Sequence, residues 1–343
     1  MSIYNKIRRF MSSVTLSRGL ELVNNLKSRG SYKPHWYKLP VTTLIEQVGD
    51  IPVRDVTPEM VHDWYDAIRA KPNERTGKPM SPYTVNSYAR ALRAYFGHLV
   101  NMGHIDESPA LNLRLPKLPT TSKNAISDSD LERVISAAKL RLRDYAIILI
   151  LRDSGVRVGE LVAMTLENIR FETYTFEQIS DERIDQTYGF SPRRRIRVLE
   201  DNDVITPGMD VRLRGRAMVL DEKTGKYRMI SFQHEAAVAL RHYLDARPAT
   251  SHDALWVNER NDEPLKASGV QEMLKKLKRK TGVKRCNAHS FRHRLAKKLK
   301  ERRVDPEIIS RILGHSDVRT YQTVYGTTRD TELIDYHTMY VDF

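Results

Sequence analysis

The chain has 343 residues, 40% of them apolar, which is enough for two domains that each bury a core. Its single cysteine, Cys286, excludes an intramolecular disulfide and a cysteine-based zinc site, and the lack of a signal peptide or an apolar run of about 18 residues predicts a cytoplasmic protein with no membrane segment. Lys and Arg number 57 against 43 acidic residues, and the net charge of +14 favours a polyanionic partner such as nucleic acid.

Residues 1–114 are predicted to form a helical domain. One helix is expected to start at Pro58 behind a Thr57 cap, and a second to start at Ser81-Pro82. The second helix has a continuous apolar stripe, which predicts a buried face. Its other face carries polar and basic side chains that form either a DNA surface or a solvated surface: Tyr88, Arg90, Arg93 and His98.

A linker is predicted at residues 115–124, where prolines and then Thr, Thr, Ser and Asn interrupt the periodic pattern. Residues 125–343 follow as a second domain, whose first helix is expected to be capped at Ser127. The run from Tyr145 to Leu151 is apolar on nearly every side, and this predicts a buried helix or strand.

Residues 171–216 are polar and are predicted to be irregular. They contain a basic cluster, which is either a solvated loop or an insertion that touches the DNA backbone: Arg193, Arg194, Arg195 and Arg197. Two β-prone runs at 217–220 and 227–232 flank a polar loop and predict a hairpin. From Glu235 onwards the pattern is helical again. The predicted fold class is therefore mainly α with a small β-sheet (α+β).

Three segments of the second domain bring cationic or imidazole groups to expected helix ends. They are Gly155-Val-Arg157-Val-Gly-Glu160-Leu, His289-Ser-Phe-Arg292-His293, and Leu313-Gly314-His315 with Tyr325 ten residues later. A phosphodiester that is being cleaved needs its nonbridging oxygens neutralised, which guanidinium groups do with paired hydrogen bonds. It also needs a nucleophile and an acid for the leaving oxygen. These residue types supply both without a metal.

Taken in this order, the motifs resemble those of the phage-integrase family of tyrosine recombinases, over about residues 125–330. The preceding segment, from Ser81 through the linker, looks like the family's helical core-binding domain, which binds DNA. The resemblance implies a core-binding domain followed by a catalytic domain. It also implies site-specific recombination of double-stranded DNA through a 3′-phosphotyrosine and a Holliday junction. The implied assembly is a homotetramer on two DNA sites, without a cofactor or a metal; accessory proteins remain open.

The resemblance also implies roles for individual residues. Arg157 and Arg292 would clamp the scissile phosphate, and His289 would accept a proton or orient the phosphate. His315 would hydrogen-bond a nonbridging oxygen, and Tyr325 would attack the phosphorus. Glu160 would support Arg157 or its helix, because a carboxylate aimed at the phosphate would repel it.

Two of these assignments have a rival. Lys223 aligns with the family's hairpin lysine, which is thought to protonate the leaving 5′-oxygen, but Glu222 replaces the usual glycine and Lys226 is the alternative. Tyr321 competes with Tyr325 as the nucleophile, although the ten-residue spacing from His315 favours Tyr325.

The sequence also allows other functions and two arrangements of its C-terminal segment. A relative with the same chemistry could relax supercoils or resolve hairpin telomeres, and a protein that has lost catalysis could simply bind DNA. The complete set of two arginines, two histidines and a tyrosine argues against a pure binder. The apolar segment after Tyr325 is expected either to pack on its own domain or to dock on a neighbouring protomer.

Overall fold

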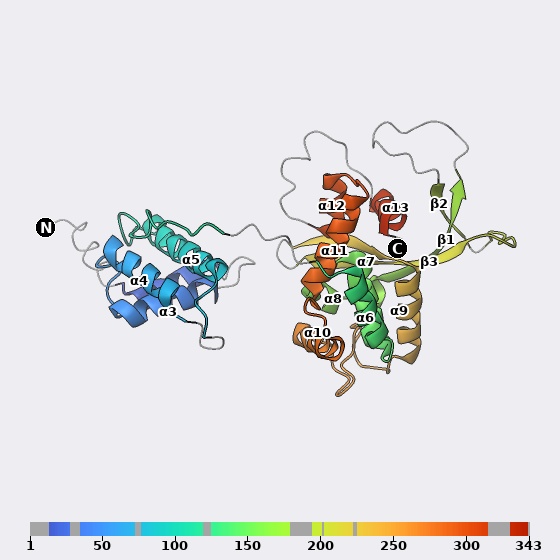
Figure 1. Cartoon of the computed structure of the whole chain (residues 1–343), viewed down its shortest axis with the longest axis horizontal. Coiled ribbons are helices and arrows are strands. Elements are labelled where there is room, and N and C mark those ends of the chain that lie inside the picture. Colours follow the sequence, from blue (N-terminus) through green and yellow to red (C-terminus); the bar gives the residue numbers. More distant parts are fainter. Residues whose placement is uncertain are drawn as a thin grey trace. The chain divides into compact units, whose positions relative to one another are not determined.

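The computed structural model describes residues 14–27, 35–72, 77–118, 125–178, 194–200, 202–221, 225–314 and 330–341. The chain divides into two compact units, Met1–Thr121 and Ser122–Phe343, each of which is described by itself (Figure 1). Within the described ranges, no helix has both the length and the apolar character needed to cross a membrane.

The first unit is built from helices. They are α2 (Leu16–Lys27), α3 (His35–Val48), α4 (Pro58–Ala70) and α5 (Pro82–Asn101). Two starts match the prediction: the Thr57 hydroxyl accepts the Met60 N–H at 3.3 Å, and the Ser81 hydroxyl accepts the Thr84 N–H at 3.1 Å. The aromatic side chains of α4 and α5 fill a core of this unit's own.

The second unit combines a small sheet with helices. Its elements are α6 (Asp128–Ala138), α7 (Leu142–Ser154), α8 (Val158–Val162), η2 (Leu166–Asn168), β1 (Ile169–Gln178), β2 (Arg194–Val198), β3 (Val211–Asp221), β4 (Lys226–Phe232), α9 (His234–Ala246), α10 (Ala267–Thr281), α11 (Ala288–Glu301), α12 (Pro306–Leu313) and α13 (Asp330–Val341). The antiparallel sheet has the strand order β2-β1-β3-β4. This architecture confirms the predicted fold class, and the β3–β4 pairing confirms the predicted hairpin.

The prediction that residues 171–216 are irregular is wrong for three stretches, which form most of β1, all of β2 and the first half of β3. The charges that made this segment look irregular pair across the strands. Glu172 on β1 meets Arg214 at 3.0 Å and Arg216 at 2.7 Å on β3. In the basic cluster, Arg197 lies on β2 and pairs with Asp203, whereas Arg193 falls outside the described residues.

Helix α7 is the apolar run predicted to be buried, and it is a helix with every residue from Ala146 to Leu151 buried. It packs on α9, α11 and β4. The helix ends at Gly155, whose φ of +57° lies in the left-handed region that favours glycine. This turn leads directly to Arg157, the residue that caps α8.

The C-terminal helix α13 packs on its own unit, against β4, α11 and α12. Val341 joins the apolar cluster of α11 and α12. His337 is buried in a polar contact: its Nε2 lies 2.8 Å from the Asp153 carbonyl oxygen, and its Nδ1 lies 3.3 Å from the Gln233 side-chain amide. Residues 330–341 therefore pack on their own unit, and docking of this segment on a neighbouring protomer stays a prediction.

Candidate active site

Arg157 is the most exposed of the clustered arginines, with 37% of its side chain accessible. Its guanidinium donates to the Glu160 carboxylate at 2.8 Å, to Asp221 at 3.2 Å and to the Gly314 carbonyl oxygen at 2.8 Å. The backbone N–H of Arg157 also donates to Glu160, at 2.9 Å, which closes the first turn of α8. A ligand arriving from solvent can therefore reach a guanidinium whose direction is already fixed.

Arg292 projects from α11 into the same region and is only 6% exposed. Its guanidinium donates to the Gly155 carbonyl oxygen at 2.9 Å and to the Leu313 carbonyl oxygen. Burial, together with the charges of Arg157 and Arg228, lowers the pKa of Arg292 to about 10, so the group is still a cation at neutral pH. Arg157 and Arg292 thus contact adjacent carbonyl groups.

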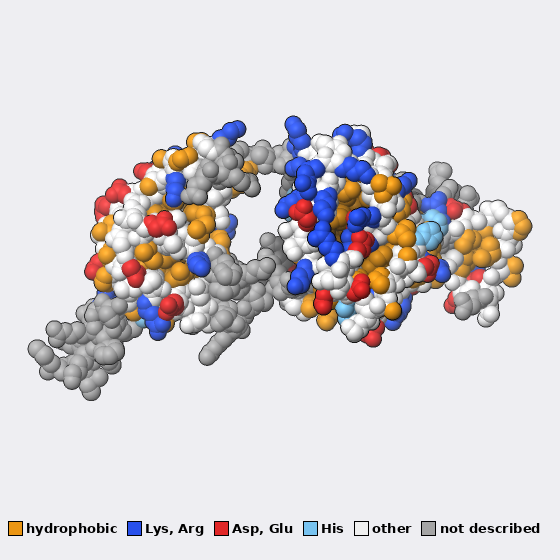
Figure 2. All heavy atoms as spheres, turned by 90° about the horizontal axis from the view of Figure 1, so that it is seen from below, with side chains coloured by type: hydrophobic (Ala, Val, Ile, Leu, Met, Phe, Trp, Pro, Cys, Tyr) orange, Lys and Arg blue, Asp and Glu red, His pale blue; other side chains and the backbone are white. Residues whose placement is uncertain are grey.

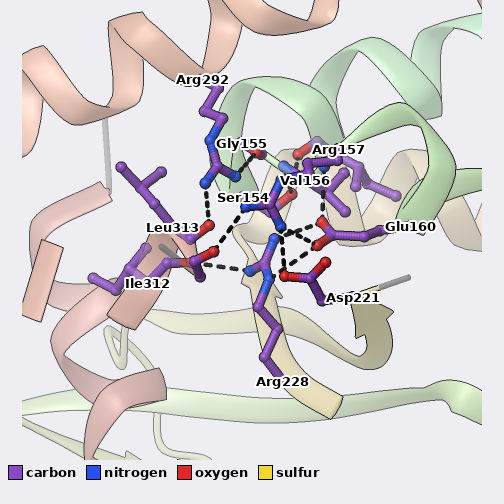
Figure 3. A network of polar contacts seen from close by, with 12 residues as sticks. Ser154, Gly155, Val156, Arg157, Glu160, Asp221, Arg228, Arg292, Ile312 and Leu313 are labelled. Atoms are coloured by element: carbon purple, nitrogen blue, oxygen red, sulfur yellow. Dashed lines mark hydrogen bonds and ion pairs between the residues drawn. The ribbon is translucent and has the colours of Figure 1, made fainter. Parts of the chain in front are cut away.

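Arg228 and Asp221 belong to this cluster, although the sequence interpretation assigned no role to either. Arg228 on β4 donates to Glu160 at 2.7 Å and to the Ile312 carbonyl oxygen at 3.0 Å, and Asp221 ends β3 beside Arg157 (Figure 3). The available signal was Arg228 itself, a charged residue that immediately precedes the apolar Met229 and Ile230 in a predicted strand.

Glu160 is the carboxylate at the centre of the cluster and is 3% exposed. Burial alone would raise its pKa, but the neighbouring Arg228 and Arg157 outweigh burial and hold the pKa below its usual value. Three guanidinium groups then face two carboxylates, those of Glu160 and Asp221, which leaves one net positive charge for an anionic ligand.

His289 lies in the first turn of α11 and is exposed, one helical turn before Arg292. Its ring packs edge-on against the ring of His293, with a centroid distance of 4.1 Å. The structure therefore brings Arg157, Glu160 and Arg292 together and places His289 on the same helix as Arg292. Lys223, His315 and Tyr325, with the rival Tyr321, lie outside the described residues, as does the side chain of Lys226.

Clusters of His, Cys, Asp and Glu that could hold a metal ion are absent from the described part of the chain. Cys286, three positions before His289, is buried, and burial raises the pKa of its thiol to about 11. The thiol is therefore protonated at neutral pH and belongs to the core.

Residues 208–332 match the sequence profile of the phage integrase family. The chain is also similar to the tyrosine recombinase XerA of Pyrococcus furiosus, with 28% identity over 260 residues that cover 75% of this chain and 74% of the relative.

Two solved structures share the fold. An integrase of transposon Tn1549, in complex with a circular intermediate DNA, aligns with a TM-score of 0.59 and 18% identity over 92% of this chain and 96% of that one. A lambda integrase dimer bound to a core site aligns with a TM-score of 0.58 and 16% identity over 92% and 99%.

Proposed function

Because this chain is a tyrosine recombinase of the phage integrase family, an enzyme that cleaves and rejoins DNA, we propose that the arginine cluster is its phosphate-binding centre. One observation carries this proposal. Arg157 and Arg292 come from different helices but donate to the carbonyl groups of Gly314 and Leu313, which are adjacent in the chain. The two guanidiniums therefore converge on one point, as the two nonbridging oxygens of a phosphodiester require.

The proposed reaction uses no cofactor. The Tyr325 oxygen attacks phosphorus while His289 accepts the phenolic proton or orients the phosphate. The bond to the 5′-oxygen breaks, and the ammonium of Lys223, or of the rival Lys226, protonates that oxygen. The products are a 3′-phosphotyrosine and a free 5′-hydroxyl. Rejoining reverses these steps with a 5′-hydroxyl from a partner strand, so the energy of the original bond is conserved.

His315 is proposed to hydrogen-bond a nonbridging oxygen, and Glu160 to hold Arg157 in place. The contribution of each arginine should be large. Removing a donor from a preorganised oxyanion site costs about 2.7–4 kcal/mol in the transition state. The contacts of Arg157 and Arg292 with protein carbonyls fix both side chains before DNA arrives, which is the preorganisation that makes such donors effective.

The DNA partner is proposed to contact both units, with residues 1–114 as a core-binding domain, 115–124 as a linker and 125–343 as the catalytic domain. In the second unit, exposed basic side chains crowd the end of α10 and the following turn: Lys275, Lys276, Lys278, Arg279, Lys280, Lys284 and Arg285. Figure 2 shows Lys and Arg side chains gathered on one face of this unit. Such a surface suits a phosphate backbone. We further propose a homotetramer on two DNA sites, acting in the cytoplasm.

Covalent trapping tests the proposed chemistry. Duplexes that bind the wild-type chain are first selected from a randomised pool, and then resynthesised with a nick at successive positions so that a cleaved strand cannot rejoin. A 3′-phosphotyrosine adduct mapped to Tyr325, formed in the presence of a chelator and lost in Tyr325→Phe, is the expected result. An adduct that survives in Tyr325→Phe would assign the nucleophile to Tyr321. If a bound duplex gives no adduct at any nick position, the proposal of catalysis fails.

A further inference from the structure

The last turn of α12 is held by three arginines from three different elements. Its three consecutive carbonyl oxygens each accept a different guanidinium: Ile312 from Arg228, Leu313 from Arg292 and Gly314 from Arg157. The final carbonyl groups of a helix have no partner within the helix and carry the negative end of its dipole. Cations from outside the helix therefore satisfy this turn (Figure 3).

Only one of these three arginines lacks an assigned role in the reaction. Arg228 is 12% exposed, so it is poorly placed to meet DNA itself. It nevertheless makes the contacts that connect the cluster, because its guanidinium bonds both Glu160 on α8 and the end of α12. Glu160 in turn bonds the backbone N–H and the guanidinium of Arg157.

Close packing supports the same connection. Gly314 has a φ of +63°, and a Cβ atom built there would lie 2.5 Å from Cδ of Arg228 and 2.6 Å from its Nε. The Arg228 side chain thus lies directly against the backbone where α12 ends. The next residue in the chain is His315, and strand β4, which carries Arg228, begins three positions after Lys223 in the sequence.

We propose that Arg228 is a positioning residue, which fixes the end of α12 and the β3–β4 hairpin relative to the phosphate-binding arginines through Glu160 and the Ile312 carbonyl group. This inference rests on the proposed function. Its chemical basis is the fork of the guanidinium, which presents donors in two directions, whereas the single ammonium of lysine cannot serve both partners in the same way. A positive charge at residue 228 is therefore not sufficient to hold both Glu160 and the Ile312 carbonyl group.

The test compares Arg228→Lys, Arg228→Met and a matched control. Arg143 on α7 is likewise mostly shielded from solvent, with 10% of its side chain exposed, and it joins a carboxylate, Asp144 at 2.8 Å, to a distant backbone carbonyl, that of Val257 at 2.9 Å. Arg143→Lys therefore causes the same kind of loss away from the cluster. For each variant, the rate of adduct formation on the nicked duplex is measured at saturating protein, together with the Kd for the same duplex.

Both Arg228 variants are expected to form the adduct about 10- to 100-fold more slowly, the range found when a residue that orients a metal ligand is removed, with a Kd close to that of the wild type. Arg143→Lys is expected to keep the wild-type rate. The proposal is overturned if Arg228→Lys reacts at the wild-type rate, because charge alone would then suffice. It is also overturned if Arg143→Lys is slowed as much as Arg228→Lys, since general stability would explain both.

A measurement without DNA separates this inference from the proposed function. Amide hydrogen exchange in residues 306–314 is expected to be faster in Arg228→Lys than in the wild type, and unchanged in Arg143→Lys. If the wild type forms no adduct on a bound duplex, the proposed function fails while this exchange result still tests the anchoring of α12. Equal exchange in the wild type and Arg228→Lys would remove the anchoring contact on which the inference depends.

Discussion

The guanidinium groups of Arg157, Arg228 and Arg292 already donate hydrogen bonds to other groups of the protein when no DNA is present. Each guanidinium has five N–H donors. The terminal nitrogens of Arg292 donate to the carbonyl oxygens of Gly155 and Leu313, while Arg157 keeps more than a third of its side chain exposed. The two arginines proposed to bind phosphate are therefore unequal: Arg157 is partly open to solvent, whereas Arg292 is buried and its terminal nitrogens already donate to protein carbonyl groups.

Gly314→Ala tests the close packing at the end of α12. The substitution forces a side chain into the left-handed region, which costs about 1–2 kcal/mol, and the new Cβ also displaces Arg228. We expect a larger loss in the free energy of unfolding than in the control Gly282→Ala. Gly282 ends α10 with a φ of +70°, but a Cβ there would meet no atom within 4 Å.

Urea unfolding of residues 122–343 measures both variants. Trp256 is the sole tryptophan of this unit and is fully buried, so its fluorescence reports the transition. Equal losses for Gly314→Ala and Gly282→Ala would mean that the backbone conformation accounts for the whole effect and that crowding of Arg228 costs nothing.

At the scale of elements, α13 is fixed by polar groups that are fully buried. The neutral ring of His337 satisfies both of its nitrogens: Nε2–H donates to the Asp153 carbonyl oxygen and Nδ1 accepts from Gln233. Thr338, the next residue, accepts a hydrogen bond from Arg214 on β3 at 3.3 Å. These contacts join the C-terminal helix to α7 and to the sheet, and the hydrogen bond that Nδ1 accepts requires an uncharged imidazole.

Acidification should therefore loosen α13. Burial lowers the pKa of His337 from 6.5 to about 4, against the opposing effect of Asp153. Because the folded pKa lies below the unfolded value, the unfolded chain binds more protons, and stability is lost as the pH falls from about 6.5 towards 4. The expected loss between pH 7.5 and pH 5 is about 2 kcal/mol.

The pH dependence is measured by urea unfolding of residues 122–343 at both pH values. His337→Gln should remove most of the difference, because an amide can occupy this position without titrating. His242→Gln, which replaces an exposed histidine on α9, should keep the difference. If the wild type and His337→Gln lose the same stability on acidification, the histidine does not control the docking of α13.

The local pattern was sufficient to predict helices with strong end signals. Thr57, Ser81 and Ser127 each cap the helix expected of them, and the apolar run before Gly155 is buried on all sides. The pattern failed where long-range pairing outweighs composition. The local pattern around Glu172 is typical of a loop. In the fold, Glu172 lies on a strand because Arg214 and Arg216 of β3, more than 40 positions away, neutralise its charge.

The same limit applies to the site. Motif order singled out Arg157, Glu160 and Arg292, and these residues do lie together. The place of Arg228 could not be predicted, because its partners on α8 and α12 are 68 and 84 positions away in the chain. A contact over such a separation depends on how the sheet packs against both helices, and no local periodicity records it.

The whole molecule is two units, and each buries a core of its own. The net charge of +14 covers both units, while the exposed basic cluster at residues 275–285 belongs to the second one alone. The second unit should therefore remain folded and bind DNA by itself. The affinity of the whole chain should include further phosphate contacts from the first unit.

The salt dependence of DNA binding measures how the phosphate contacts are divided between the two units. The Kd of the full chain and of residues 122–343 for one selected duplex is determined by fluorescence anisotropy between 50 and 200 mM salt, a range in which each phosphate contact adds about 0.9 to the logarithmic slope. The full chain is expected to give the steeper slope. Equal slopes would show that the first unit makes no phosphate contact, and would contradict its proposed role in binding DNA.

The acceptors at the end of α12 also affect how this site can change during evolution. Every amino acid carries a main-chain oxygen, so no substitution at Ile312 or Leu313 can delete the group that an arginine contacts. Drift in those two side chains is limited only by the apolar cluster in which they are buried. Each arginine, in contrast, supplies its donors through its side chain, so a single codon change removes them. Substitutions should therefore be tolerated at Ile312 and Leu313 and be removed by selection at the three arginines.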